Sequence, residues 1–102
     1  MSPMTRALVP VADGRVLVID DNPANTALAS RILGRAGLPG VYELHDPTRA
    51  SHVLDEFDPD VVLLDLRMPV MDGFAVLEVI QRQSIGQYLP VIIITADDSH
   101  ES

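Results

Sequence analysis

The stretch RVLVIDDNP at residues 15–23 decides the fold, together with VVLLDL at residues 61–66. Each stretch is built on an unbroken run of Val, Ile and Leu, which is typical of a parallel strand buried on both faces. Both runs end on carboxylates, at Asp20 and Asp21 in the first stretch and at Asp65 in the second. The sequence therefore predicts two buried strands that each deliver acidic side chains at their carboxyl ends.

A third apolar run, VIIIT at residues 91–95, ends on the hydroxyl of Thr95. Open α/β sheets bind their ligands just beyond the carboxyl ends of the parallel strands. We therefore expect three carboxylates and one hydroxyl at a single edge of one sheet. Carboxylates gathered in this way suit a hard divalent cation such as Mg²⁺, which prefers oxygen ligands and keeps several waters. A phosphoryl group is the natural partner of such a cation.

Length and composition restrict the class of protein. The chain has 102 residues, enough for one domain. It carries 15 acidic residues against 7 basic ones, and all seven are arginines without a cluster, so no nucleic-acid footprint is expected. No apolar run reaches the roughly 20 residues of a membrane-spanning helix. The chain has no cysteine, which excludes disulfides and thiolate metal sites and agrees with a reducing, cytoplasmic location.

The remaining pattern predicts strands that alternate with helices. Strands are expected at residues 15–20, 41–45, 61–66 and 91–95. Asn22-Pro23 and Asp46-Pro47 are helix starts, because Asn and Asp are good N-caps and Pro suits the first helical position. Gly37 and Asp58-Pro59 are helix stops. The resulting βαβαβαβ order predicts an α/β fold with parallel strands and right-handed crossovers.

Apolar side chains at helical spacing mark the inward faces of three helices. They are Leu28, Ile32 and Leu33 in the first helix, Ala50, Val53, Leu54 and Phe57 in the second, and Phe74, Val76, Leu77 and Ile80 in the third. No helix is expected after residue 95, which would leave the fourth strand as an uncovered apolar edge. We therefore expect residues 15–102 to be part of a larger domain, preceded by a loosely ordered leader at residues 1–14.

The candidate site residues have simpler interpretations that must be weighed. Asp20 and Asp21 precede a helix start, where Asp is common for capping alone, and Thr95 could be an ordinary β-branched strand residue. Asp65 is harder to explain in this way, because a carboxylate at the end of a buried strand costs free energy unless it is paired or bound to metal. His45, His52 and His100 share no spacing and are expected on the surface.

Three stretches together resemble one known family. VLVIDDNP, VVLLDLRMPVMDGF and LPVIIITA, in this order and spacing, are similar to the most diagnostic stretches of the receiver domain of two-component response regulators. The resemblance covers the chain from about residue 15 to its end. It implies a flavodoxin-like, doubly wound parallel sheet of strand order 2-1-3-4-5, with the fifth strand and the last helices missing from these 102 residues.

The resemblance also implies a role for each acidic residue. Asp65 corresponds to the phosphoacceptor, which takes a phosphoryl group from a sensor histidine kinase or a phosphotransfer protein. Asp21, Asp65 and the backbone carbonyl of Arg67 would ligate Mg²⁺, with Asp20 acting mainly through bound water, and Thr95 would contact the phosphoryl group. Such a domain is a self-phosphorylating, cytoplasmic signalling switch rather than an enzyme with a separate substrate. A fused or downstream output domain and a homodimer are further expectations, without direct nucleic-acid contact by this domain.

One part of the family pattern is missing. Receiver domains carry a lysine at the end of the fifth strand, and this sequence contains none. A longer natural protein is the simplest explanation. The alternative function is a receiver-like protein-interaction module that is not phosphorylated. An aspartate-nucleophile phosphatase is a third interpretation. It is disfavoured because those enzymes have the pattern Asp-x-Asp at the first strand, whereas Asp20 and Asp21 are adjacent here.

Overall fold

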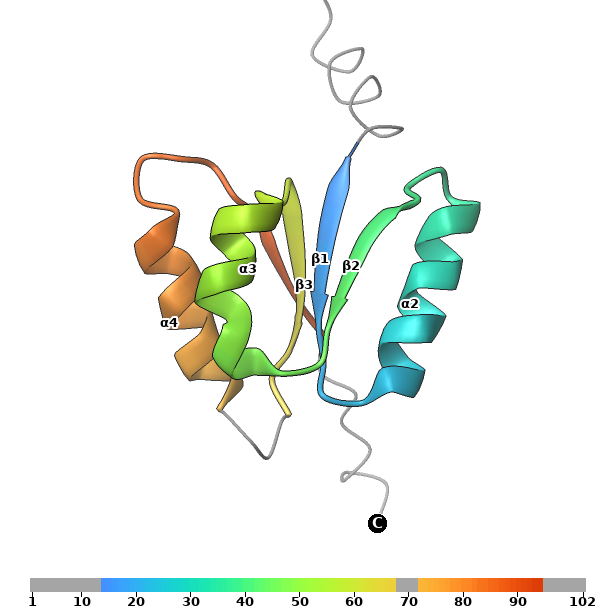
Figure 1. The fold of residues 1–102 in the computed structure, drawn as a ribbon, viewed down its shortest axis with the longest axis horizontal. Helices are drawn as coiled ribbons and strands as arrows, with labels where there is room; N and C mark the ends of the chain where they lie inside the picture. Colours follow the sequence, from blue (N-terminus) through green and yellow to red (C-terminus); the bar gives the residue numbers. More distant parts are fainter. Residues whose placement is uncertain (1–13, 68–71, 95–102) are drawn as a thin grey trace, which may run out of the picture.

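The structure is a computed structural model that describes residues 14–67 and 72–94. Its strands are β1 (Arg15–Ile19), β2 (Gly40–Leu44), β3 (Val61–Asp65) and β4 (Val91–Ile94). Its helices are α2 (Pro23–Arg35), the 3-10 turn η2 (Pro47–Arg49), α3 (Ala50–Phe57) and α4 (Gly73–Gln83). All strand pairs are parallel and the sheet order is β2-β1-β3-β4, as predicted for the first four strands (Figure 1).

The predicted start and stop of the first helix are confirmed. The Asn22 side chain accepts a hydrogen bond of 3.0 Å from the Ala24 N–H, and Pro23 occupies the first helical position. After the helix, Gly37 adopts a φ of 94°, in the left-handed region that favours glycine. The chain then turns so that the Leu38 N–H donates to the Leu33 carbonyl at 2.8 Å. This is the closing bond of a Schellman-type C-terminus.

The second helix begins with a tighter turn than the sequence pattern indicated. Asp46 caps it through the Thr48 N–H at 3.1 Å, but the first turn is the 3-10 turn η2, and the α-helix α3 begins only at Ala50. The helix ends at Phe57, and the C-cap residue Asp58 has a φ of 51°, in the left-handed region, directly before Pro59. The Asp-Pro start and stop signals are therefore both confirmed.

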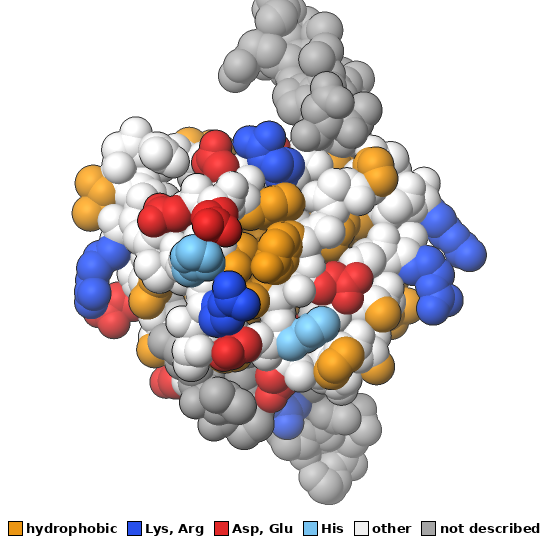
Figure 2. Space-filling model, in the orientation of Figure 1, with side chains coloured by type: hydrophobic (Ala, Val, Ile, Leu, Met, Phe, Trp, Pro, Cys, Tyr) orange, Lys and Arg blue, Asp and Glu red, His pale blue; other side chains and the backbone are white. Residues whose placement is uncertain are grey.

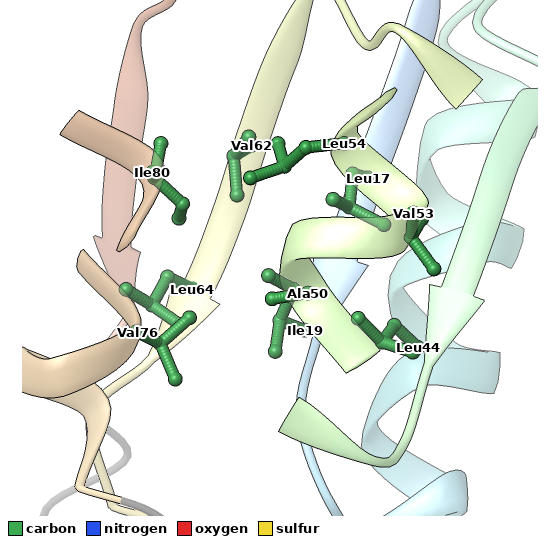
Figure 3. Packing of buried hydrophobic residues seen from close by; sticks show 10 residues of the cluster. All are labelled: Leu17, Ile19, Leu44, Ala50, Val53, Leu54, Val62, Leu64, Val76 and Ile80. Atoms are coloured by element: carbon green, nitrogen blue, oxygen red, sulfur yellow. The ribbon is translucent and has the colours of Figure 1, made fainter. Parts of the chain in front are cut away.

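The core lies between the sheet and the helices α3 and α4. Figure 3 shows ten buried side chains from β1, β2, β3 and the two helices pointing toward one another. They are Leu17, Ile19, Leu44, Ala50, Val53, Leu54, Val62, Leu64, Val76 and Ile80. Every second residue of β1 and β3 reaches this layer, because successive side chains of a strand point to opposite faces. The other face of β1 is covered by α2, where Val16 and Val18 are buried.

Two of the predicted inward faces are partly wrong. Leu28 and Ile32 are 53% and 58% exposed, because α2 packs on the sheet through the neighbouring stripe that contains Thr26 and Leu33. Phe74 is 63% exposed, because Val76 and Ile80 define the buried stripe of α4 and Phe74 lies to one side of it. Apolar spacing predicted these helices correctly but not which of their apolar residues would be covered.

The prediction of an uncovered fourth strand is confirmed for the described residues. Ile92, Ile93 and Ile94 of β4 are all exposed, and β4 forms one edge of the sheet. No helix in the described part of the chain is long and apolar enough to cross a membrane. On the face drawn in Figure 2, arginine side chains are spread among acidic ones.

Candidate functional site

The three aspartates meet at the carboxyl edge of the sheet. β1 and β3 are neighbours, and their register pairs Ile19 with Leu64, so the next residues of the two strands, Asp20 and Asp65, lie opposite each other. Each of Asp20, Asp21 and Asp65 offers a carboxylate oxygen within 4.8 Å of the others. The parallel sheet thus brings together residues that are 45 positions apart in the sequence.

The carboxylate of Asp20 is held from the first turn of α2. Its side chain is buried, and its backbone N–H donates to the Leu44 carbonyl of β2 at 3.1 Å. Oδ1 accepts from the Asn22 backbone N–H and Oδ2 from the Asn25 side-chain amide, both at 3.0 Å. Both oxygens of this buried acid therefore have donors, as buried polar groups require.

Asp65 lies in an environment that disfavours its charged form. It is only 7% exposed, and this burial raises the pKa of its carboxyl group above the ordinary value of 3.8. The Arg67 backbone N–H donates to Oδ1 at 3.1 Å, which opposes the shift, whereas the negative charges of Asp20 and Asp21 raise the pKa further. Burial and the neighbouring negative charges therefore both act against ionisation of this carboxylate.

The geometry fits a small divalent cation. Mg²⁺ holds its oxygen ligands at about 2.0–2.1 Å, so opposite ligands of one ion lie about 4 Å apart. Three carboxylates with oxygens within 4.8 Å of one another approach this spacing, with waters completing the coordination. A bound cation would also offset the mutual repulsion that raises the pKa of Asp65. The described residues thus include an acidic cluster able to hold a metal ion.

The next helix packs closely against the residue that follows Asp65. Gly73, the first residue of α4, is buried against Leu66, which directly follows Asp65. A Cβ atom on Gly73 would lie 2.4 Å from the Leu66 Cα atom, far inside any real contact. Only glycine allows α4 to start this close to the end of β3.

Other predicted residues have mixed outcomes. Thr95 lies outside the described residues, although it directly follows Ile94, the register partner of Asp65. The role of the Arg67 carbonyl remains a prediction. His45 and His52 are exposed, as expected, and His100 is outside the described part of the chain.

Sequence reasoning missed a polar cluster between α2 and β2. Glu43 Oε1 accepts from Thr26 Oγ1 at 2.9 Å, and Oε2 accepts from Ser30 Oγ at 2.6 Å. These bonds, with that of Ser30 first, lower the pKa of the Glu43 carboxyl group below 4.5. The spacing of Thr26 and Ser30, four residues apart on α2, was the available signal, but nothing in the sequence paired it with Glu43. Asn25 was missed for the same reason.

Comparison with known proteins assigns the fold to a family. The response regulator receiver domain family matches residues 16–102 of the chain. The chain belongs to this family. A solved structure of the N-terminal domain of a response regulator receiver protein from Methanoculleus marisnigri JR1 is 31% identical, with a TM-score of 0.74. The match covers 82% of this chain and 68% of that one.

Two curated relatives show how far the similarity extends in full proteins. This receiver domain is 37% identical over 91 residues to the transcriptional regulatory protein TrcR of Mycobacterium tuberculosis, covering 86% of the chain and 34% of TrcR. It is 35% identical over 106 residues to the sensory/regulatory protein RpfC of Xanthomonas campestris, covering 99% of the chain and 14% of RpfC. The chain thus spans about a third or less of these relatives.

Proposed function

We propose that this receiver domain is the phosphoacceptor of a two-component phosphorelay and that Asp65 takes the phosphoryl group. The observation that carries the proposal is the convergence of Asp20, Asp21 and Asp65 at the carboxyl edge of the sheet. A structural role would not require three repelling carboxylates, since two at about 4 Å already repel by roughly 1–4 kcal/mol. Membership of the receiver family supports the same function.

The proposed reaction is an in-line phosphoryl transfer. A carboxylate oxygen of Asp65 attacks phosphorus on a phosphohistidine donor, the bond from phosphorus to the imidazole nitrogen breaks, and an acyl phosphate forms on Asp65. When bound, Mg²⁺ would neutralise charge on the transferring group. Asp21, Asp65 and the Arg67 carbonyl would hold the ion, with Asp20 acting through water. The fixed backbone N–H of Arg67 orients the attacking carboxylate through Oδ1.

The remaining roles follow from the same proposal. Thr95 would contact the phosphoryl group and relay the change at the site to the surface of the domain. The donor would be a cytoplasmic sensor histidine kinase or phosphotransfer protein, and a fused or downstream output domain would receive the signal. The domain would then act on itself and would not turn over a separate substrate.

The proposal is tested by incubating the chain with Mg²⁺ and a small acyl phosphate donor, followed at once by intact-mass measurement. We expect the mass of one added phosphoryl group in the unaltered chain and in Asp55→Asn, whose exposed carboxylate lies on α3 away from the site. Asp65→Asn should show no addition. Phosphorylation that persists in Asp65→Asn would refute the assignment. No addition in any variant would instead favour the interaction module without phosphorylation.

A further inference from the structure

We propose that Asn25 is a positioning residue that keeps the Asp20 carboxylate directed toward Asp65 in the metal-free site. The inference rests on the function proposed above and concerns how the cation site is prepared. Its starting point is the hydrogen bond of 3.0 Å from Asn25 Nδ2 to Asp20 Oδ2. Asn25 lies in the first turn of α2 and is otherwise exposed to solvent.

The need for such a restraint comes from repulsion within the acidic cluster. Asp20 faces Asp65 and Asp21 with carboxylate oxygens within 4.8 Å of one another. Rotation of the Asp20 side chain away from its neighbours would relieve this repulsion before any cation arrives. The Asn25 amide opposes that rotation, because rotation would break its bond to Oδ2, and the Asn22 backbone N–H holds the other oxygen, Oδ1, at 3.0 Å.

The chemical type of the donor matters as much as its place. An ionised carboxylate can only accept hydrogen bonds, so its partner must present N–H groups, and the Asn amide offers two. A Lys or Arg donor would bring a positive charge that competes with the cation for Asp20. The amide of Asn25 fixes the carboxylate while leaving its negative charge available. Asn is also a weaker helix former than Ala, so helix stability does not explain its presence here.

A matched pair of variants separates positioning from general stability. Asn25→Ala removes a neutral donor that lies in the first turn of α2 and bonds the carboxylate of Asp20. Thr48→Ala removes a comparable neutral donor, the Thr48 hydroxyl that bonds Asp46 Oδ1 at 2.6 Å in the first turn of η2. Asp46 is not part of the acidic cluster. Both variants retain the backbone contacts of their helix starts, so both should fold.

The measurement is isothermal titration calorimetry of the chain with Mg²⁺ alone, with circular dichroism melts to confirm folding. We expect Asn25→Ala to weaken Mg²⁺ binding roughly tenfold, at the low end of the losses that follow when an outer hydrogen-bond partner of a metal site is removed. Thr48→Ala should change the affinity less than about twofold. Asn25→Gln keeps an amide on a longer side chain and should retain more affinity than the Ala variant. At saturating Mg²⁺, the maximal rate of phosphorylation in Asn25→Ala should return to that of the unaltered chain.

The outcomes distinguish this inference from the proposed function. An Asn25→Ala affinity within about twofold of the unaltered chain would overturn the inference alone, as would an equal loss in Thr48→Ala or in Asn25→Gln. A maximal rate that saturating Mg²⁺ does not restore would also overturn it. Mg²⁺ binding without phosphorylation in the unaltered chain would refute the proposed function and leave the role of Asn25 standing. A chain that binds no Mg²⁺ would refute both.

Discussion

The proposed phosphoacceptor, Asp65, lies where its charged form destabilises the metal-free fold. It is buried beside two other acids, and burial, followed by these charges, raises its pKa. The folded, metal-free chain therefore holds this proton more tightly than the unfolded chain does. By linkage, the free energy of unfolding falls as the pH rises from 3.8 through the raised pKa of Asp65. A cation bound at neutral pH would reverse this loss, because it binds the folded chain.

Asp65→Asn should therefore stabilise the metal-free chain. Near neutral pH we expect a gain on the order of 1 kcal/mol in the free energy of unfolding, the size of the repulsion that is removed. The gain should disappear at a pH below 3.8, where the carboxyl group is protonated in both states. Urea unfolding with and without Mg²⁺ measures both effects. A variant that is less stable than the unaltered chain at neutral pH, without Mg²⁺, would contradict this account.

Glu43 has the opposite linkage. Its pKa is lowered by the hydroxyls of Ser30 and Thr26, so it stabilises the fold above pH 4.5, and this contribution is lost as the pH falls through the lowered pKa. The bonds join the edge strand β2 to α2. His45 adds to the cluster, with Nε2 2.7 Å from Thr26 Oγ1.

Ser30→Ala tests this cluster. We expect a loss of about 0.5–1 kcal/mol near neutral pH, because a hydrogen bond to a charged group is lost while Ala improves the helix slightly. The loss should shrink in acid as Glu43 becomes protonated. Ser51→Ala, on an exposed turn of α3, is the control and should not destabilise the chain. Urea titrations at several pH values measure the difference, and a loss independent of pH would argue against the role of Glu43.

The start of α4 packs closely against the residue that follows β3. Gly73 is buried against Leu66, and the Asp72 side chain caps the helix by accepting from the Phe74 N–H at 3.0 Å. The buried stripe of the helix then continues through Val76 and Ile80 into the core. The position of α4 therefore depends both on apolar packing and on the absence of a Cβ atom at Gly73.

Gly73→Ala and Gly34→Ala should have opposite effects. At Gly73 a Cβ atom would lie 2.4 Å from the Leu66 backbone, so we expect a loss of about 1–3 kcal/mol from overpacking. At Gly34, inside α2, the added Cβ would meet no atom within 4 Å beyond the adjoining residues and the backbone of its own helix, so Ala should stabilise the helix by about 0.5–1 kcal/mol. Thermal melts followed by circular dichroism report both. Equal effects of the two substitutions would show that the close approach is not rigid.

The helices of the described chain cover some parts of the sheet and leave others exposed to solvent. Helices α3 and α4 cover one face, whereas on the other face α2 lies over β1 and β2 (Figure 1). Ile92 and Ile94 of β4 remain exposed, and the outer edge of β4 has no partner strand among the described residues. An exposed apolar edge strand is a template for pairing with another chain.

The 102-residue chain should therefore self-associate as its concentration rises. We expect Ile92→Lys to shift the chain toward monomer, because a charge on the exposed face blunts the edge strand. Sedimentation velocity over a concentration series measures the effect. Ile85→Lys is the control, since Ile85 is also exposed but lies in the connection between α4 and β4. An equal shift in both variants would point to net charge rather than the β4 edge.

Local patterns in the sequence determined the elements and the chemistry of the site. The Val and Ile runs predicted the strands, and Asn22-Pro23, Gly37 and Asp46-Pro47 predicted the helix boundaries, because these signals act within a few residues. The acids at the strand ends predicted the acidic edge, since parallel strands place their carboxyl ends together. The cluster of Asp20, Asp21 and Asp65 follows from topology alone.

Only the tertiary structure decided which side chains meet across the chain. Leu28, Ile32 and Phe74 have the spacing of buried residues but are exposed, because burial depends on how each helix is rotated against the sheet. The bonds of Asn25 to Asp20 and of Ser30 to Glu43 likewise depend on where α2 lies over β1 and β2. The pattern of residues around one partner does not indicate the other partner. Periodicity and spacing therefore could not predict these hydrogen bonds.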